Sequence, residues 1–61
     1  MLKVIKVFGG LPNTRHKNGK LYKILTWSED ETTIEDRAKH VHGDKLILLS
    51  DNGIYGLYVR T

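Results

Sequence analysis

Residues 45–60 of this 61-residue chain read KLILLSDNGIYGLYVR, two apolar runs separated by Asp51-Asn52-Gly53. Asn followed by Gly tolerates the positive φ angles of a two-residue type I′ turn, the turn that commonly joins the strands of a β-hairpin. The first run is continuously apolar, as in a central strand, and the second is rich in β-branched and aromatic residues. The stretch therefore predicts a hairpin. Because an isolated hairpin is only marginally stable in water, other strands must pack onto it.

Gly56 interrupts the second run of this hairpin. A glycine inside a strand weakens the strand, so its presence indicates a bulge or the close approach of another chain segment.

Length and composition indicate one small domain over residues 1–61. A chain this short buries only about 60% of the surface of its unfolded form, and homodimer formation is one way for it to gain core. There is no cysteine, hence no disulfide and no thiolate metal site. No apolar run approaches the ~20 residues of a membrane span, and no secretory signal opens the sequence. We expect a cytoplasmic protein without membrane association.

Charge is distributed unevenly along the chain. Residues 1–27 hold six basic residues and no acidic ones, whereas residues 28–61 hold four basic and seven acidic residues. This asymmetry predicts one basic and one acidic face, and a basic face indicates binding to nucleic acid or to an acidic protein. Ordinary solvation explains the pattern equally well, because lysines often guard the edges of small sheets.

The basic half of the chain predicts two or three further strands. LKVIKVF at 2–8 and the segment at 20–27 favour β structure, and a second Asn-Gly pair at 18–19 could join a short strand at 13–17 to the latter. Strict alternation along 20–27 places Trp27 on the face of Lys23, and Tyr22 on the opposite face.

Residues 29–41 form the helix candidate. Ser28 and Glu31 match the capping box S-x-x-E, Ile34 and Ala38 begin a narrow apolar stripe, and Gly43 suits a left-handed C-terminal cap. The alternative is an irregular loop or short strand within a five-stranded barrel.

These segments predict an α+β fold, a small antiparallel sheet of four to five strands with one helix packed on it. The alternative is a small SH3-like β-barrel. The expected core consists of the apolar residues of these elements: Val4, Ile5, Val7, Leu21, Ile24, Leu25, Ile34, Ala38, Val41, Leu46, Ile47, Leu48, Leu57 and Val59.

Catalytic and metal-binding motifs are absent from the sequence. The glycines at 9–10 lack the spacing of a phosphate-binding loop or a dinucleotide-binding fingerprint, and His40-x-His42 matches no recognised ligand pattern. Ser28, Ser50 and Asp51 are better explained as a cap and a turn than as parts of a hydrolase. We therefore expect no enzymatic activity, no cofactor and no metal.

Nucleic-acid binding, to DNA or RNA, is the favoured functional hypothesis. In it, cationic side chains neutralise phosphates while Trp27 stacks on a base, together with Tyr22 or Tyr58. A structural role for Trp27 at the rim of the sheet is the alternative. The predicted cations are Arg15, Lys17, Lys20, Lys23 and Arg60.

The second hypothesis is a protein-binding regulator or inhibitor, of the kind found among phage and mobile-element proteins. Its contact surface would be the acidic helix segment 29–36 or an open edge of the sheet, to which a larger protein could add a strand.

Overall fold

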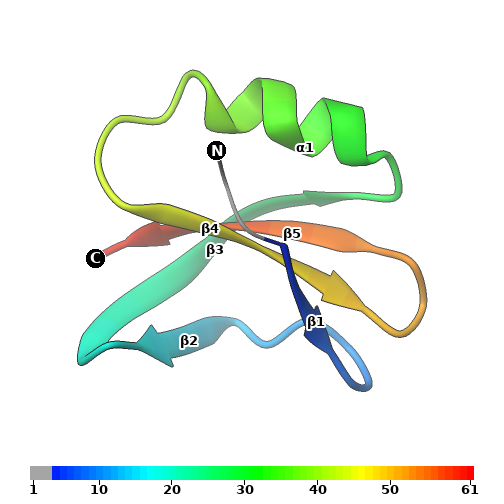
Figure 1. The fold of residues 1–61 in the computed structure, drawn as a ribbon, viewed down its shortest axis with the longest axis horizontal. Helices are drawn as coiled ribbons and strands as arrows, with labels where there is room; N and C mark the ends of the chain where they lie inside the picture. Colours follow the sequence, from blue (N-terminus) through cyan, green and yellow to red (C-terminus); the bar gives the residue numbers. More distant parts are fainter. Residues whose placement is uncertain (1–3) are drawn as a thin grey trace.

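The computed structural model describes residues 4–61, which form a five-stranded sheet with one helix lying across one of its faces (Figure 1). Within residues 4–61 no helix has the length and apolar character needed to cross a membrane. The elements, in chain order, are β1 (Val4–Val7), β2 (Thr14–Lys17), β3 (Lys20–Ser28), α1 (Glu31–Ala38), β4 (Lys45–Ser50) and β5 (Tyr55–Arg60).

The strand order is β1-β4-β5-β3-β2, and the sheet is mixed. The contacts β4–β5, β5–β3 and β3–β2 are antiparallel, as predicted, but β1 runs parallel to β4, with Val4 opposite Ile47. The predicted antiparallel pairing therefore holds for three of the four strand contacts and fails at β1. The predicted combination of a small sheet with one packed helix is confirmed.

The sheet curls so strongly that it resembles half of a barrel (Figure 1). β1 and β2 are its two edges and do not pair with each other, so the barrel is not closed. The strand predicted at 2–8 is observed over Val4–Val7, while Leu2 and Lys3 lie outside the described residues.

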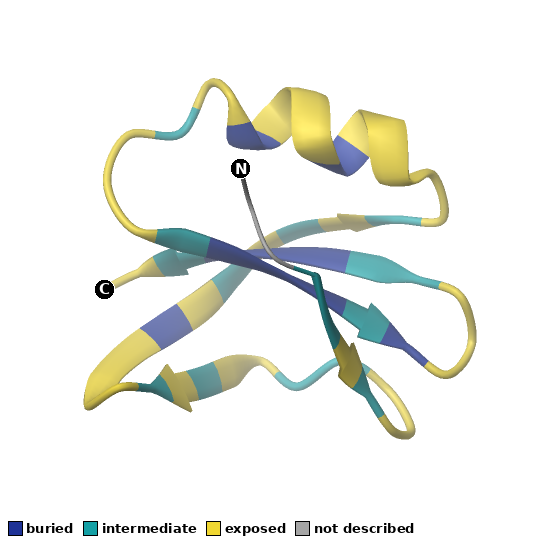
Figure 2. Cartoon of the chain, viewed as in Figure 1, coloured by how far each residue is buried: buried dark blue, intermediate teal, exposed yellow. Residues whose placement is uncertain are grey.

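The buried residues of the sheet lie mainly in its central strands β4 and β5 (Figure 2), and the sheet has a separate apolar cluster on each face. On the helix-side face, Ile34 and Ala38 of α1 pack against Ile47 and Leu57. The opposite face, which we call the inner face, carries a cluster of Tyr22, Leu46, Leu48 and Tyr58, against which Ile5, Val7, Leu11 and Ile24 pack.

Two predicted core residues are exposed, Leu21 at 36% and Leu25 at 56%. In β3 it is Tyr22, at 7% exposed, that faces the core. The pairing of β3 with β5 shifts register between Ile24 and Thr26, which is a β-bulge at Leu25. The extra residue reverses the alternation, so Trp27, opposite Gly56, lies on the same face as Tyr22 rather than with Lys23. The other predicted core residues are buried or half-buried.

The two Asn-Gly turns differ. Asn18 and Gly19 both have positive φ angles, 54° and 77°, as the type I′ turn between β2 and β3 requires. In the β4–β5 hairpin only Gly53 has a positive φ, and its amide donates to the carbonyl of Ser50 at 3.1 Å. The amide of Ser50 also donates to the carbonyl of Ile54 at 2.9 Å, so residues 51–53 form a three-residue loop and not the predicted two-residue turn. The buried Ser50 hydroxyl favours it by accepting from the Asn52 and Ile54 amides.

The helix is shorter than predicted and begins two residues later. Asp30 is its N-cap, accepting a hydrogen bond from the amide of Thr32, and Ser28 accepts from the amide of Asp30 instead of forming the capping box with Glu31. Gly43 does have a positive φ of 87°, but it lies in the loop before β4, beyond the end of the helix at Ala38.

Gly56 is explained by close approach. A β-carbon at this position would lie 2.8 Å from Cδ1 of Leu11, which the β1–β2 connection places on the inner face. Tyr58 fixes the same connection, because its hydroxyl donates to the carbonyl of Pro12.

Candidate nucleic-acid interface

The β2–β3 hairpin brings cationic side chains together on the inner face. Lys17 lies opposite Lys20, and Arg15 lies opposite Tyr22, which in turn lies opposite Arg60 of β5. Directly opposed residues of antiparallel strands point to the same face of the sheet. Four of the five predicted cations therefore occupy one end of the inner face. We call Arg15, Lys17, Lys20 and Arg60 the cationic surface.

Asp44, in the loop before β4, is the acidic neighbour of this surface. Its carboxylate accepts from Nζ of Lys20 at 3.1 Å and lies 3.5 Å from NH1 of Arg60. The hydrogen bond and positive charge of Lys20, with a smaller contribution from Arg60, hold the pKa of Asp44 below its usual value of 3.8. Within residues 4–61 both ion pairs involve Asp44, so Arg15 and Lys17 keep their charges unpaired.

Arg15 also lies close to the inner-face cluster. It is half-buried, and among the described residues its Nε atom has no hydrogen-bond partner. Burial raises the pKa of the Tyr58 phenol above its usual 10.0, and the positive charge of Arg15 partly opposes that shift. The side chain of Arg15 therefore lies between the apolar inner-face cluster and the other cations of the cationic surface.

The remaining predicted site residues lie apart from the cationic surface or are buried. Lys23 pairs with Thr14 and Val59 and thus points to the helix-side face. Tyr58 is 0% exposed and Tyr22 is 7% exposed, so neither ring offers a free face to a base.

Trp27 is 63% exposed and shares the inner face with the cationic surface, which simple alternation had not predicted. It stands near the other end of β3. At ~3.3 Å per residue, Trp27 and Lys20 are separated by on the order of 20 Å along the strand.

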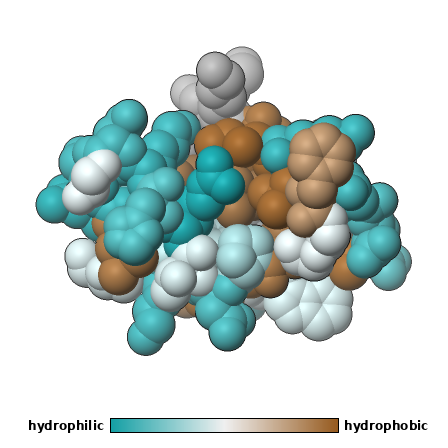
Figure 3. Space-filling model, turned by 90° about the horizontal axis from the view of Figure 1, so that it is seen from below, coloured by the Kyte–Doolittle hydropathy of each residue, from teal (hydrophilic) through white to brown (hydrophobic). Residues whose placement is uncertain are grey.

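Seen from the side away from α1, the protein surface has an apolar centre flanked by hydrophilic side chains (Figure 3). On this side of the sheet the half-buried residues Ile5, Val7, Leu11 and Ile24 pack against the inner-face cluster. The acidic segment 29–36 lies on the other side of the sheet (Figure 1). The fold thus separates the acidic helix from the basic hairpin.

Sequence reasoning missed two features of the structure. The pairing of Asp44 with Lys20 and Arg60 depends on tertiary structure and has no local signal. Phe8 was predicted to lie in the first strand, but it follows the end of β1 and is 83% exposed. The sequence signal for this is that Phe8 stands directly before Gly9-Gly10, a pair that ends regular structure.

No three histidine or acidic side chains of residues 4–61 come together as ligands for a metal ion. No protein-family model, curated protein or solved structure matches the chain. The interpretation of the site therefore depends on its geometry.

Proposed function

We propose that this protein is a non-catalytic nucleic-acid-binding protein that holds a phosphate backbone against the cationic surface. The observation that carries the proposal is the gathering of four cations from β2, β3 and β5 on one face, where Asp44 is the only carboxylate of residues 4–61 that forms an ion pair with them. Phosphate neutralisation releases condensed counterions and is the main source of sequence-independent affinity.

The separation of Trp27 from the cationic surface along β3 favours a single-stranded nucleic acid. An unpaired strand can place its backbone on the cationic surface and extend along β3, where Trp27 offers an exposed ring for base stacking. Stacking on an aromatic side chain contributes about 1–3 kcal/mol per base and tolerates any sequence. Because four cations are available, binding should weaken with salt, with a slope of about −2 to −3 in log K against log salt.

The test is fluorescence anisotropy of labelled single-stranded and duplex oligonucleotides over a range of salt concentrations. The variant Arg15→Glu/Lys17→Glu reverses two unpaired charges on the inner face. We expect it to weaken binding at least tenfold and to flatten the salt dependence.

The matched control is Lys23→Glu/Lys39→Glu, which makes the same change in net charge on the helix side of the sheet. It should leave most of the affinity intact. Equal losses in the two variants would mean that net charge alone matters, and absence of binding by the unmodified protein at low salt would refute the proposal.

A second candidate function is strand addition by a protein partner. Strand β1 is an edge of the sheet and pairs with β4 alone. Its side chains are apolar except for Lys6, and the exposed Phe8 follows it, whereas the β2 edge carries Arg15 and Lys17. Charged side chains discourage edge pairing, so β1 is the edge more open to an added strand.

This candidate is tested by affinity capture from a lysate of the source organism. A protein that binds specifically should be lost with Phe8→Lys, which places a charge beside β1, and retained with Arg15→Glu/Lys17→Glu. The opposite pattern would exclude β1 as its binding site.

A further inference from the structure

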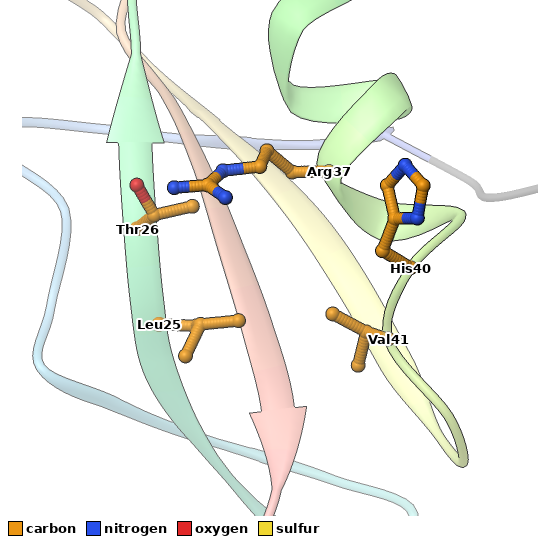
Figure 4. Close-up of a pocket in the computed structure, with 5 residues that line it drawn as sticks. All are labelled: Leu25, Thr26, Arg37, His40 and Val41. Carbon is orange, nitrogen blue, oxygen red and sulfur yellow. The ribbon is translucent and has the colours of Figure 1, made fainter.

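A cleft of about 370 Å³ lies between α1 and β3, on the opposite side of the sheet from the cationic surface. It is lined by Leu25, Thr26, Arg37, His40 and Val41 (Figure 4). This volume is at the lower end of the range typical of small-molecule sites, about 300–1,000 Å³.

The β-bulge in β3 builds one wall of this cleft. Because the register shifts between Ile24 and Thr26, the consecutive residues Leu25 and Thr26 both point toward the cleft instead of alternating (Figure 4). Bulges commonly redirect a side chain beside a functional site. The bulge accounts for the exposure of Leu25, which lines the cleft with 56% of its surface exposed.

The helix provides the opposite wall and the charge. Arg37, in the last turn of α1, extends from the helix toward Thr26, and His40 stands on the same wall (Figure 4). Within residues 4–61 no carboxylate lies within ion-pair distance of Arg37. Leu25 and Val41 add apolar surface below these polar groups. The cleft thus combines a free guanidinium, a hydroxyl and an imidazole with an apolar floor.

We propose that this cleft binds a carboxylate that carries a short aliphatic group. The guanidinium of Arg37 binds the carboxylate in the two-pronged geometry that arginine favours, and Thr26 and His40 supply further hydrogen-bond donors. The aliphatic group packs on Leu25 and Val41. The carboxylate belongs either to a free aliphatic acid or to the C-terminal residue of a peptide, since both present the same chemistry.

The test is a titration followed by two-dimensional ¹H–¹⁵N NMR, which also shows whether each variant is folded. Acetate, 4-methylpentanoate and inorganic phosphate are added separately. We expect 4-methylpentanoate to shift the resonances of the cleft residues with a Kd of about 1–10 mM, as small ligands permit. Each buried methylene tightens binding about fourfold, so acetate should bind at least tenfold more weakly.

Three variants test the roles of the lining residues. Arg37→Gln should abolish the shifts, and Leu25→Ser should remove the preference for 4-methylpentanoate over acetate. Lys39→Gln, an equal loss of charge on an exposed neighbour outside the cleft, should change nothing. Equal effects of Arg37→Gln and Lys39→Gln, or equal binding of phosphate and 4-methylpentanoate, would overturn the proposal, as would absence of shifts at the cleft.

The two sources of the carboxylate are separated with a short peptide ending in leucine and its C-terminally amidated form. Binding of the free-carboxylate peptide at least as tight as that of 4-methylpentanoate identifies a peptide terminus, and loss with the amide supports the carboxylate contact. Binding of 4-methylpentanoate but not of the peptide identifies a small acid. Binding of both peptide forms alike contradicts the proposed role of Arg37.

Discussion

Replacement of Gly56 by alanine tests the packing of the inner face directly. The added methyl group would lie 2.8 Å from Cδ1 of Leu11, 3.1 Å from Cε1 of Tyr58 and 3.4 Å from Cδ1 of Ile24. Tyr58 is fully buried and hydrogen-bonded to Pro12, so it cannot move easily, whereas Leu11 is half-buried in a loop.

The magnitude depends on two opposing effects. Overpacking a core costs about 1–3 kcal/mol. Gly56 is not in the left-handed region, so alanine stiffens the unfolded chain and stabilises the fold by about 0.4–1 kcal/mol. We expect Gly56→Ala to lower the free energy of unfolding by about 1 kcal/mol. Leu11→Ala, which removes a half-buried side chain, should lower it by about 1–2 kcal/mol.

The double variant Leu11→Ala/Gly56→Ala tests whether contact with Leu11 causes the loss of stability in Gly56→Ala. Without the Leu11 side chain the new methyl group has room, so the loss in the double variant should be about 1 kcal/mol smaller than the sum of the single losses. Urea unfolding followed by far-UV circular dichroism gives the free energies by linear extrapolation. Gly10→Ala is the control, because a β-carbon there meets open space, so this change should show only the stabilisation of about 0.4–1 kcal/mol that comes from the unfolded chain.

The reasoning fails if the two losses add within about 0.5 kcal/mol, the usual limit for independent sites, or if Gly56→Ala stabilises the protein. Either result would mean that Leu11 does not press on this strand in solution.

Three further predictions concern the turn and the two perturbed titrations. Gly19→Ala should cost about 1–2 kcal/mol in urea unfolding, because φ is 77° there, while Gly10→Ala costs nothing. Tyr58 has a raised pKa in the folded state, so the stability that it contributes is complete below pH 10 and falls as the pH rises above that value. Tyr58→Phe should therefore reduce the loss of stability at alkaline pH, and at neutral pH it should lower the free energy of unfolding by about 1 kcal/mol because a hydrogen bond is lost. Thermal unfolding at a series of pH values measures both effects. Asp44 has a lowered pKa, so its contribution to stability is present above pH 3.8 and falls as the carboxyl is protonated below that pH. In the same thermal unfolding series, Asp44→Asn should reduce the loss of stability at acid pH. An unchanged loss at acid pH would argue against the pairing of Asp44 with Lys20.

Local signals in the sequence predicted the helix and most of the strands, whereas features that depend on contacts between distant residues were not predicted. Asn18-Gly19 forms the expected turn, with a positive φ at both residues. At Asn52-Gly53, in contrast, the hydroxyl of Ser50 accepts hydrogen bonds from two loop amides and favours a different turn. The bulge at Leu25 also could not be predicted, because period-two alternation assumes an uninterrupted ladder of hydrogen bonds.

The candidate site shows the same limit. Alternation within the hairpin is a local property, so the proximity of Arg15, Lys17 and Lys20 followed from the sequence. Burial of Tyr58 and the pairing of Asp44 arise only when distant strands meet, and neither has a signature within a short window.

The parallel pairing of β1 with β4 has a consequence for folding and synthesis. β1 leaves the ribosome before its partner strand β4, which is made only after β2, β3 and α1. Closing so long a loop is slow, so β1 should join the sheet after β3, β4 and β5 have paired with one another. Until then Val4, Ile5 and Val7 are open to chaperones and to other nascent chains. Lys6, at the centre of this segment, is placed to act as a gatekeeper against aggregation.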